Sequence, residues 1–105
     1  MFLRVVLVAA LLCGVASALY CLHCQGTESS QCQKGIAEDF AYCFNKTNPG
    51  YCVSYWFNNN GVNTVARGCE YHKFGTDVCD TLKQEKGARD CTFCDSEDFC
   101  NQELL

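Results

Sequence analysis

The chain has 105 residues, with 12 acidic and 8 basic side chains, and its formal net charge at pH 7 is −4. This length is enough for one small domain. Proteins that bind nucleic acid present basic patches to the phosphates, so the acidic balance argues against a nucleic-acid partner. It provides no attraction to anionic lipid either.

The N-terminal residues have the pattern of a secretory signal sequence. A short basic start at Met1–Arg4 precedes an apolar run at Val5–Leu12, and small residues in an A-x-A arrangement end at Ala18. A membrane-spanning helix is the alternative, but it needs roughly 20 apolar residues, and this run is shorter. We therefore expect cleavage after Ala18. The mature protein is then a single domain of residues 19–105, with ten of the 11 cysteines and a net charge of about −5.

Strand signals are stronger than helix signals along the mature chain. Three segments are rich in aromatic and β-branched residues, namely Ala41–Phe44, Tyr51–Phe57 and Thr64–Tyr71. The best helix candidate is Thr81–Lys86, which ends at Gly87 and is too short to be stable alone. The expected fold is therefore small and mostly β.

The Asn60-Gly61 pair predicts a tight hairpin between the second and third of these strands. A type I′ turn needs positive φ at both central residues, which Asn and Gly tolerate. If Asn60 and Gly61 are the two turn residues, the residue numbers of each cross-strand pair sum to 121. The residues placed opposite each other are then Phe57 and Thr64, Trp56 and Val65, Tyr55 and Ala66, and Cys52 and Cys69. A longer loop from Asn58 to Asn63 is the alternative.

Two interpretations are open for the large side chains near this turn. Both faces of the Tyr51–Phe57 segment carry bulky groups. In the first interpretation, Trp56 and Phe57 pack on neighbouring hairpins. In the second, they lie partly exposed as a contact patch, because exposed aromatic side chains are common anchors of protein interfaces.

The ten mature cysteines indicate a framework of structural disulfides. Their share exceeds the roughly 8–10% that marks a disulfide scaffold, and export passes through an oxidising compartment. A domain this small buries little apolar surface, so cross-links do much of the work of a core. The two C-x2-C pairs lie too far apart for a zinc site, and no βαβ pattern supports a thioredoxin-like site. Spacing alone does not fix the pairing.

Three motifs give the mature chain a resemblance to a known family. It opens with Leu19-Tyr20-Cys21-Leu22-His23-Cys24, contains Arg67-Gly68-Cys69, and closes with Asp98-Phe99-Cys100-Asn101. With the order and number of its cysteines, it resembles the LU-domain family of lymphocyte antigen six and the urokinase receptor. Two residues separate Cys91 from Cys94, which is similar to invertebrate members, whereas vertebrate members usually place these cysteines side by side.

The resemblance implies a three-finger, snake-toxin-like fold with five disulfides. The implied pairs are Cys21–Cys52, Cys24–Cys32, Cys43–Cys69, Cys79–Cys91 and Cys94–Cys100. Four of the pairs would form a knot at one end of the molecule. The three fingers would lie within about Leu19–Lys34, between Cys52 and Cys69, and between Cys69 and Cys91. Asn101 would tie the C-terminal segment back to the knot by hydrogen bonds.

Residues for catalysis are not apparent in the sequence. The two histidines, His23 and His72, lie in segments expected to be exposed, and the chain has no G-x-S-x-G or H-E-x-x-H motif. We expect a protein that is not an enzyme, with no catalytic residues, no cofactor and no bound metal.

Two features concern processing of the exported chain. Asn45-Lys46-Thr47 is an N-glycosylation sequon beside the turn predicted at Asn48-Pro49-Gly50, so we expect a glycan at Asn45, with an unmodified loop asparagine as the alternative. Only Asn101–Leu105 follow the last cysteine, which is too short for the hydrophobic tail of a glycolipid-anchor signal. The expectation is a secreted, extracellular protein without a membrane anchor of its own.

The functional expectation is a monomeric, non-enzymatic binding module for an extracellular or membrane protein. The resemblance favours modulation of a receptor or ion channel, such as a nicotinic acetylcholine receptor. The alternatives are a structural or developmental factor at epithelial junctions or in the matrix, and a hydrolase on the same scaffold. The expected contact residues lie at the tip of the second finger: Trp56, Phe57, Asn58, Asn60 and Val62.

Overall fold

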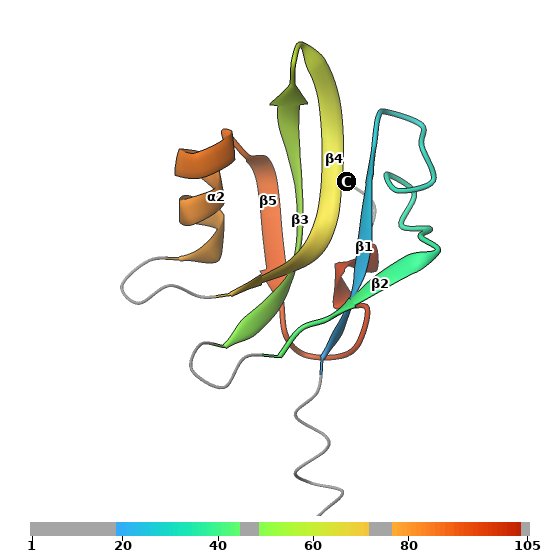
Figure 1. Ribbon diagram of the computed structural model, residues 1–105, viewed down its shortest axis with the longest axis vertical. Coiled ribbons are helices and arrows are strands. Elements are labelled where there is room, and N and C mark those ends of the chain that lie inside the picture. The colour runs from blue at the N-terminus through green and yellow to red at the C-terminus, as the bar shows by residue number, and fades with distance from the viewer. Residues whose placement is uncertain (1–18, 45–48, 72–76, 104–105) are drawn as a thin grey trace, which may run out of the picture.

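A computed structural model describes residues 19–44, 49–71 and 77–103 (Figure 1). The predicted signal sequence, the sequon at Asn45 and His72 lie outside these residues. The elements, in chain order, are β1 (Tyr20–Gly26), β2 (Asp39–Tyr42), β3 (Gly50–Asn59), β4 (Val62–Tyr71), α2 (Val78–Lys86), β5 (Arg89–Cys94) and the short 3-10 helix η1 (Cys100–Gln102). Within the described ranges, no helix is long and apolar enough to cross a bilayer.

The five strands form one antiparallel sheet in the order β2-β1-β4-β3-β5. In Figure 1 the β3–β4 hairpin extends furthest, with β1 and β2 on one side of it and β5 and α2 on the other. The predicted small, disulfide-rich, mostly-β fold is confirmed.

The first finger is longer than the expected Leu19–Lys34. Its second strand is β2, which pairs Tyr20 with Tyr42 and His23 with Asp39. Between the two strands the chain makes a series of turns closed by backbone hydrogen bonds, such as that from the Ile36 N–H to the Gln31 carbonyl. The predicted finger ended too early in the chain because β1 and β2 are connected by this series of turns, which is longer than a tight hairpin loop.

The predicted register of the β3–β4 hairpin is confirmed. Every pair sums to 121, from Gly50 opposite Tyr71 to Asn59 opposite Val62. Asn60 and Gly61 have φ angles of 53° and 91°, as a type I′ turn requires. The Asn58 side-chain oxygen also accepts a hydrogen bond from the Gly61 N–H at 2.6 Å. The alternative of a longer loop is therefore wrong.

Gly61→Ala tests how strongly this turn supports the hairpin. A Cβ atom at Gly61 would meet no atom within 4 Å, so its whole effect comes from the left-handed backbone. We expect the free energy of unfolding to fall by about 1–2 kcal/mol, measured by urea titration under non-reducing conditions. Gly68→Ala is the control, because its Cβ would make one ordinary contact of 3.5 Å with the His23 ring. Equal effects of the two substitutions would contradict the prediction.

Helix α2 begins three residues earlier than predicted. The Asp77 side chain accepts hydrogen bonds from the N–H groups of Cys79 and Asp80 and so caps the helix at its N-terminus. The C-terminal end is as predicted, because Gly87 adopts a left-handed conformation with φ of 67°. The buried side chains of α2 pack on β3, in a cluster that consists of Val53, Tyr55, Val78, Leu82 and Ala88.

The five disulfides are the pairs that the resemblance implies: Cys21–Cys52, Cys24–Cys32, Cys43–Cys69, Cys79–Cys91 and Cys94–Cys100. Three of them, those of Cys21, Cys43 and Cys94, form one cluster with Leu19, which we call the disulfide cluster. The expectation of four at one end is wrong in one respect. Cys79–Cys91 instead joins α2 to β5, where Cys91 packs against the α2–β3 core.

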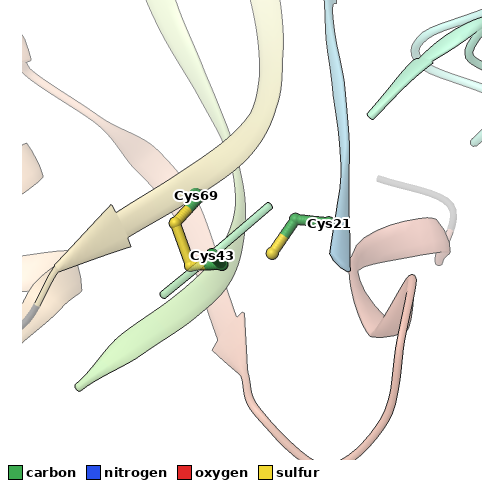
Figure 2. A group of neighbouring side chains, drawn as sticks. All are labelled: Cys21, Cys43 and Cys69. Atoms are coloured by element: carbon green, nitrogen blue, oxygen red, sulfur yellow. A yellow bond between two sulfur atoms is a disulfide. The ribbon is translucent and has the colours of Figure 1, made fainter. Parts of the chain in front are cut away.

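Sulfur atoms in the disulfide cluster lie close together. Figure 2 shows the Cys43–Cys69 bond with the Cys21 sulfur directed toward it, and the three sulfur atoms lie within 4.8 Å of one another. Such a group would resemble a metal site if its members were thiolates. All three sulfurs are bonded in disulfides, and a metal ligand must be a thiolate, so the cluster serves as a cross-link.

A buried arginine joins the first finger to the centre of the sheet. Arg67 on β4 is 2% exposed. Its guanidinium donates to the carbonyls of Cys32 at 2.6 Å, Gln33 at 2.9 Å and Asn101 at 2.5 Å, and to the Ser54 hydroxyl at 3.1 Å. Desolvation lowers the pKa of Arg67. These four hydrogen bonds compensate for the buried charge by occupying donors that would otherwise be unsatisfied.

Asn101 connects the C-terminal segment to two strands. Its side-chain amide donates to the carbonyls of Leu22 and Val53, each at 3.1 Å, and its side-chain oxygen accepts from the Leu22 N–H at 3.0 Å. Its own backbone carbonyl accepts from Arg67 and Ser54. These bonds give Asn101 the structural position that the resemblance implies.

Candidate functional site: an exposed aromatic surface

The predicted contact surface at the tip of the second finger is not formed as expected. Trp56 is 8% exposed and packs with Val65 and the Cys24–Cys32 disulfide. The expectation that Trp56 lies exposed is wrong, and the packing interpretation holds for this residue. The reason is that the turns of the first finger cover the face of β3 from which Trp56 projects.

The other predicted contact residues lie at the tip but do not form an aromatic patch. Phe57 is half-buried, with its ring 5.9 Å from that of Tyr55, and packs against the α2–β3 core. Asn58, Asn60 and Val62 are exposed. The tip therefore offers polar side chains and one exposed aliphatic group, without the aromatic anchor that was expected from Trp56.

Aromatic side chains, all exposed except the half-buried Tyr20, gather instead on the first finger and the C-terminal loop. We call this group the aromatic surface; it consists of Tyr20, Phe40, Tyr42, Phe44 and Phe99. The Tyr20 ring is at its centre, 5.7 Å from Phe40, 5.2 Å from Tyr42 and 6.5 Å from Phe99. The Phe40 side chain is 61% exposed and that of Tyr42 is 51% exposed. Exposed apolar patches are uncommon on small domains, so the aromatic surface is the candidate contact site.

The strand pairing of the first finger explains how these rings meet. Phe40 and Tyr42 alternate along β2, which is an edge strand of the sheet, and β1 places Tyr20 opposite Tyr42. Side chains two apart on a strand share a face, so Phe40 and Tyr42 lie on the same side. Phe44 follows just after the strand, with its ring 6.0 Å from that of Tyr42.

The C-terminal loop contributes Phe99 through a fixed backbone. The Phe99 N–H donates to the Tyr20 carbonyl at 2.7 Å, and the Tyr20 N–H donates to an Asp98 carboxylate oxygen at 3.0 Å. Phe99 has a φ of 59°, an unfavourable value for a bulky residue. The two hydrogen bonds and the neighbouring Cys94–Cys100 disulfide hold it there. The aromatic surface is thus built on constrained backbone.

Carboxylates flank the aromatic surface. Glu38 and Asp39 directly precede Phe40, Glu97 and Asp98 precede Phe99, and all four side chains are exposed. Within the described stretches 19–44 and 95–103, Lys34 is the one lysine or arginine. The surface therefore combines exposed rings with negative charge.

A small hollow of about 210 Å³ opens beside two of the rings. Its lining consists of Leu22, Ala37, Asp39, Phe40, Phe99 and Gln102. The Phe40 and Phe99 rings lie 6.1 Å apart at an interplanar angle of 85°. The hollow thus has mainly apolar walls.

A larger groove of about 620 Å³ lies over the sheet between β1, β3 and β4. Ala66 and Gly68 of β4 form part of its lining, with His23 on one side and Lys86 of α2 on the other. Lys86 donates to the Tyr55 hydroxyl at 3.4 Å. His23 is exposed on β1, as predicted. This groove has small residues along β4 and charges of both signs.

The aromatic surface was not predicted, although the sequence contains part of its signal. Phe40, Tyr42 and Phe44 recur at every second position, which predicts one face of a strand. That signal does not reveal that Tyr20 and Phe99, far away in the chain, complete the cluster.

Comparisons of the chain with protein-family models, with curated proteins and with solved structures found no match.

Proposed function

We propose that this chain is a secreted, non-enzymatic three-finger protein that binds an extracellular or membrane protein through its aromatic surface. The partner class that the resemblance implies is a membrane receptor or ion channel, such as a nicotinic acetylcholine receptor. In this proposal the N-terminal segment directs export, Asn45 carries a glycan, and the monomeric protein acts by occupying a site on its partner. No step of bond chemistry is involved.

One observation carries the proposal. Five aromatic side chains are in ring contact on the outside of the domain, on backbone held by disulfides and hydrogen bonds. Aromatic side chains dominate binding energy at protein interfaces. A constrained backbone lowers the entropy that is lost on association. Exposed rings on a rigid frame are therefore suited to binding another protein.

Phe40→Ala combined with Tyr42→Ala tests the proposal. Both side chains are more than half exposed, so their loss should leave the fold intact. We expect the Kd of the oxidised, fluorescently labelled mature protein for cells that express a nicotinic receptor to rise at least about 30-fold. This corresponds to the loss of about 2 kcal/mol at a hot spot. Receptor currents recorded with and without the protein give the functional measurement.

Phe93→Ala is the matched control. Phe93 is also an exposed phenylalanine, at 42%, but it lies on β5 at the opposite edge of the sheet. Its replacement should leave receptor binding unchanged. Equal weakening by both variants, or wild-type affinity of the double variant, would contradict a role for the aromatic surface. Retention at cell junctions without any effect on currents would instead support the structural or developmental alternative.

A further inference from the structure

We propose that a short extended segment of the partner adds to the free edge of β2 as a further antiparallel strand, with apolar side chains that alternate with basic ones. This inference rests on the proposed function, because it names how the partner binds at the same aromatic surface. Three observations support it: the hydrogen-bonding pattern of the first finger, the two faces of β2 and the charge around this strand.

The outer edge of β2 has no neighbouring strand within residues 19–44, 49–71 and 77–103. β2 is the first strand in the sheet order and pairs with β1 alone. Its sequence, Asp39–Tyr42, contains neither lysine nor proline, which commonly protect an exposed edge from pairing. The strand is four residues long, so its edge suits a short segment of a partner.

The backbone groups of Phe40 and Tyr42 point to this free edge. In an antiparallel pair, residues that exchange hydrogen bonds alternate with residues whose N–H and C=O groups point away from the neighbouring strand. The Cys43 N–H donates to the Leu19 carbonyl at 2.6 Å, in register with the β1–β2 pairs. The alternation that starts from this bonded pair directs the groups of Phe40 and Tyr42 away from β1.

Strand β1 shows the same alternation from its own side. The Tyr20 N–H and carbonyl bind the C-terminal loop, and those of Leu22 bind the Asn101 side chain. Tyr20 and Leu22 lie opposite Tyr42 and Phe40, and their groups are thus directed away from β2. Phe40 and Tyr42 therefore offer two donors and two acceptors to an added strand.

The two faces of β2 determine the side chains of the added segment. Phe40 and Tyr42 project on the face of the aromatic surface, whereas Asp39 and Ala41 project on the opposite face, where Asp39 is paired with His23. A residue directly opposite Phe40 or Tyr42 projects on the same face as the exposed rings. Cross-strand pairs of aromatic and β-branched side chains are favourable. The segment that fits therefore has β-branched residues at alternate positions.

Charge selects basic residues for the positions between them. Glu38 and Asp39 are exposed at the start of β2, and Glu97 and Asp98 are exposed in the C-terminal loop. A residue opposite Asp39 projects on the same face as its carboxylate, where opposite charges form a favourable cross-strand pair. A second copy of this chain would instead bring a second set of carboxylates to the edge. A partner segment with basic residues is therefore the better occupant.

A designed peptide tests the inference without the receptor. The oxidised, ¹⁵N-labelled mature protein is titrated with capped Lys-Val-Lys-Val-Lys, whose two valines would lie opposite Tyr42 and Phe40. We expect saturable shifts of the Phe40 and Tyr42 amide signals and slower exchange of both amide protons with solvent. Docking through side chains alone would leave this exchange unchanged and would overturn the inference. The absence of binding up to millimolar concentration would also overturn it.

N-methylated forms of the peptide provide the matched control. In the antiparallel arrangement the valine N–H groups point to β2, whereas the lysine N–H groups point away from it. N-methylation of both valines should weaken binding at least about 10-fold, equivalent to about 1.4 kcal/mol, because two hydrogen bonds are lost. N-methylation of the second and third lysines should leave the affinity unchanged. Equal effects of the two modifications, or the reverse order, would overturn the inference.

Asp39→Asn tests the part of the inference that concerns charge. We expect the Kd of the unmethylated peptide to rise about threefold, as is usual for the loss of an exposed ion pair. Asp80→Asn, which changes an exposed carboxylate on α2, should have no effect. Equal Kd values for the two variants would contradict the choice of basic residues. If amide protection at Phe40 and Tyr42 rose with protein concentration alone, a second copy would occupy the edge and the assignment to a partner would be wrong.

The two proposals fail in different ways. If Phe40→Ala with Tyr42→Ala abolishes receptor binding and the peptide does not bind to β2, the aromatic surface binds the partner through side chains and the strand inference is wrong. If the peptide adds to β2 and the receptor does not bind at all, the edge has the stated chemistry and the partner class is wrong.

Discussion

Replacement of both Cys21 and Cys52 by serine is expected to unfold the domain at 37 °C. This disulfide links residues 31 positions apart, and its loss restores chain entropy worth about 3.7 kcal/mol to the unfolded state. Both side chains are 0% exposed at the centre of the disulfide cluster, so packing is lost as well. Small domains have total stabilities near the lower end of the usual 5–15 kcal/mol. The near-UV circular dichroism signal and the chemical-shift dispersion of the amide protons in NMR spectra should both be lost.

Replacement of Cys24 and Cys32 by serine is the control for this prediction. That disulfide links residues only eight positions apart, for which the same relation gives about 2.5 kcal/mol, and it lies outside the disulfide cluster. We expect this variant to keep its fold with a lower midpoint of unfolding. Trp56 is the one tryptophan in the chain and packs beside this disulfide, so its fluorescence reports the local change. A Cys21/Cys52 variant as stable as this control would contradict the prediction.

The second large effect is expected from Arg67→Met. Methionine keeps part of the apolar stem but removes every donor of the guanidinium. The Cys32 carbonyl would then keep only the Gly35 N–H as a partner, and the Asn101 carbonyl and the Ser54 hydroxyl would keep only each other. The four hydrogen bonds from the guanidinium are lost, and a hydrogen bond to a charged group contributes about 1.5–3 kcal/mol. We expect the free energy of unfolding, measured by urea titration without reductant, to fall by at least about 3 kcal/mol.

Two other substitutions make the Arg67 result specific. Arg67→Lys keeps the positive charge but lacks the planar guanidinium, so we expect an intermediate loss of stability. Arg89→Met removes an exposed arginine that donates to Asn63, and its effect should stay within about 0.5 kcal/mol. If Arg67→Met and Arg89→Met lowered the free energy of unfolding equally, this would contradict the prediction that the buried hydrogen bonds of Arg67 stabilise the fold.

Local signals in the sequence predicted the central hairpin well. Asn60 and Gly61 determine a two-residue turn, and the strand period of two then sets every pair from Gly50 to Tyr71. Gly87 likewise marked the end of α2. The disulfide pairing came from a family resemblance, because spacing alone permits many pairings. Features governed by neighbouring residues were therefore accessible from the sequence.

Features that depend on distant contacts were not predicted. The burial of Trp56 requires the turns of the first finger to fold over β3, which no pattern near Trp56 indicates. The aromatic surface joins Tyr20 to Phe99, which lie near opposite ends of the described residues. Arg67 stood out only as part of a motif, and its burial depends on carbonyls supplied by the first finger and the C-terminal segment.

The position of Asn101 has a consequence for how the chain reaches its final state. The first finger and both long strands precede it by at least 30 residues, yet Leu22, Val53 and Arg67 all need it to complete their hydrogen bonds. A nascent chain therefore lacks its native bonding at the centre until Asn101 has been synthesised. Premature termination anywhere before Asn101 yields a polypeptide with unpaired polar groups inside, a state that cellular surveillance of misfolded proteins removes.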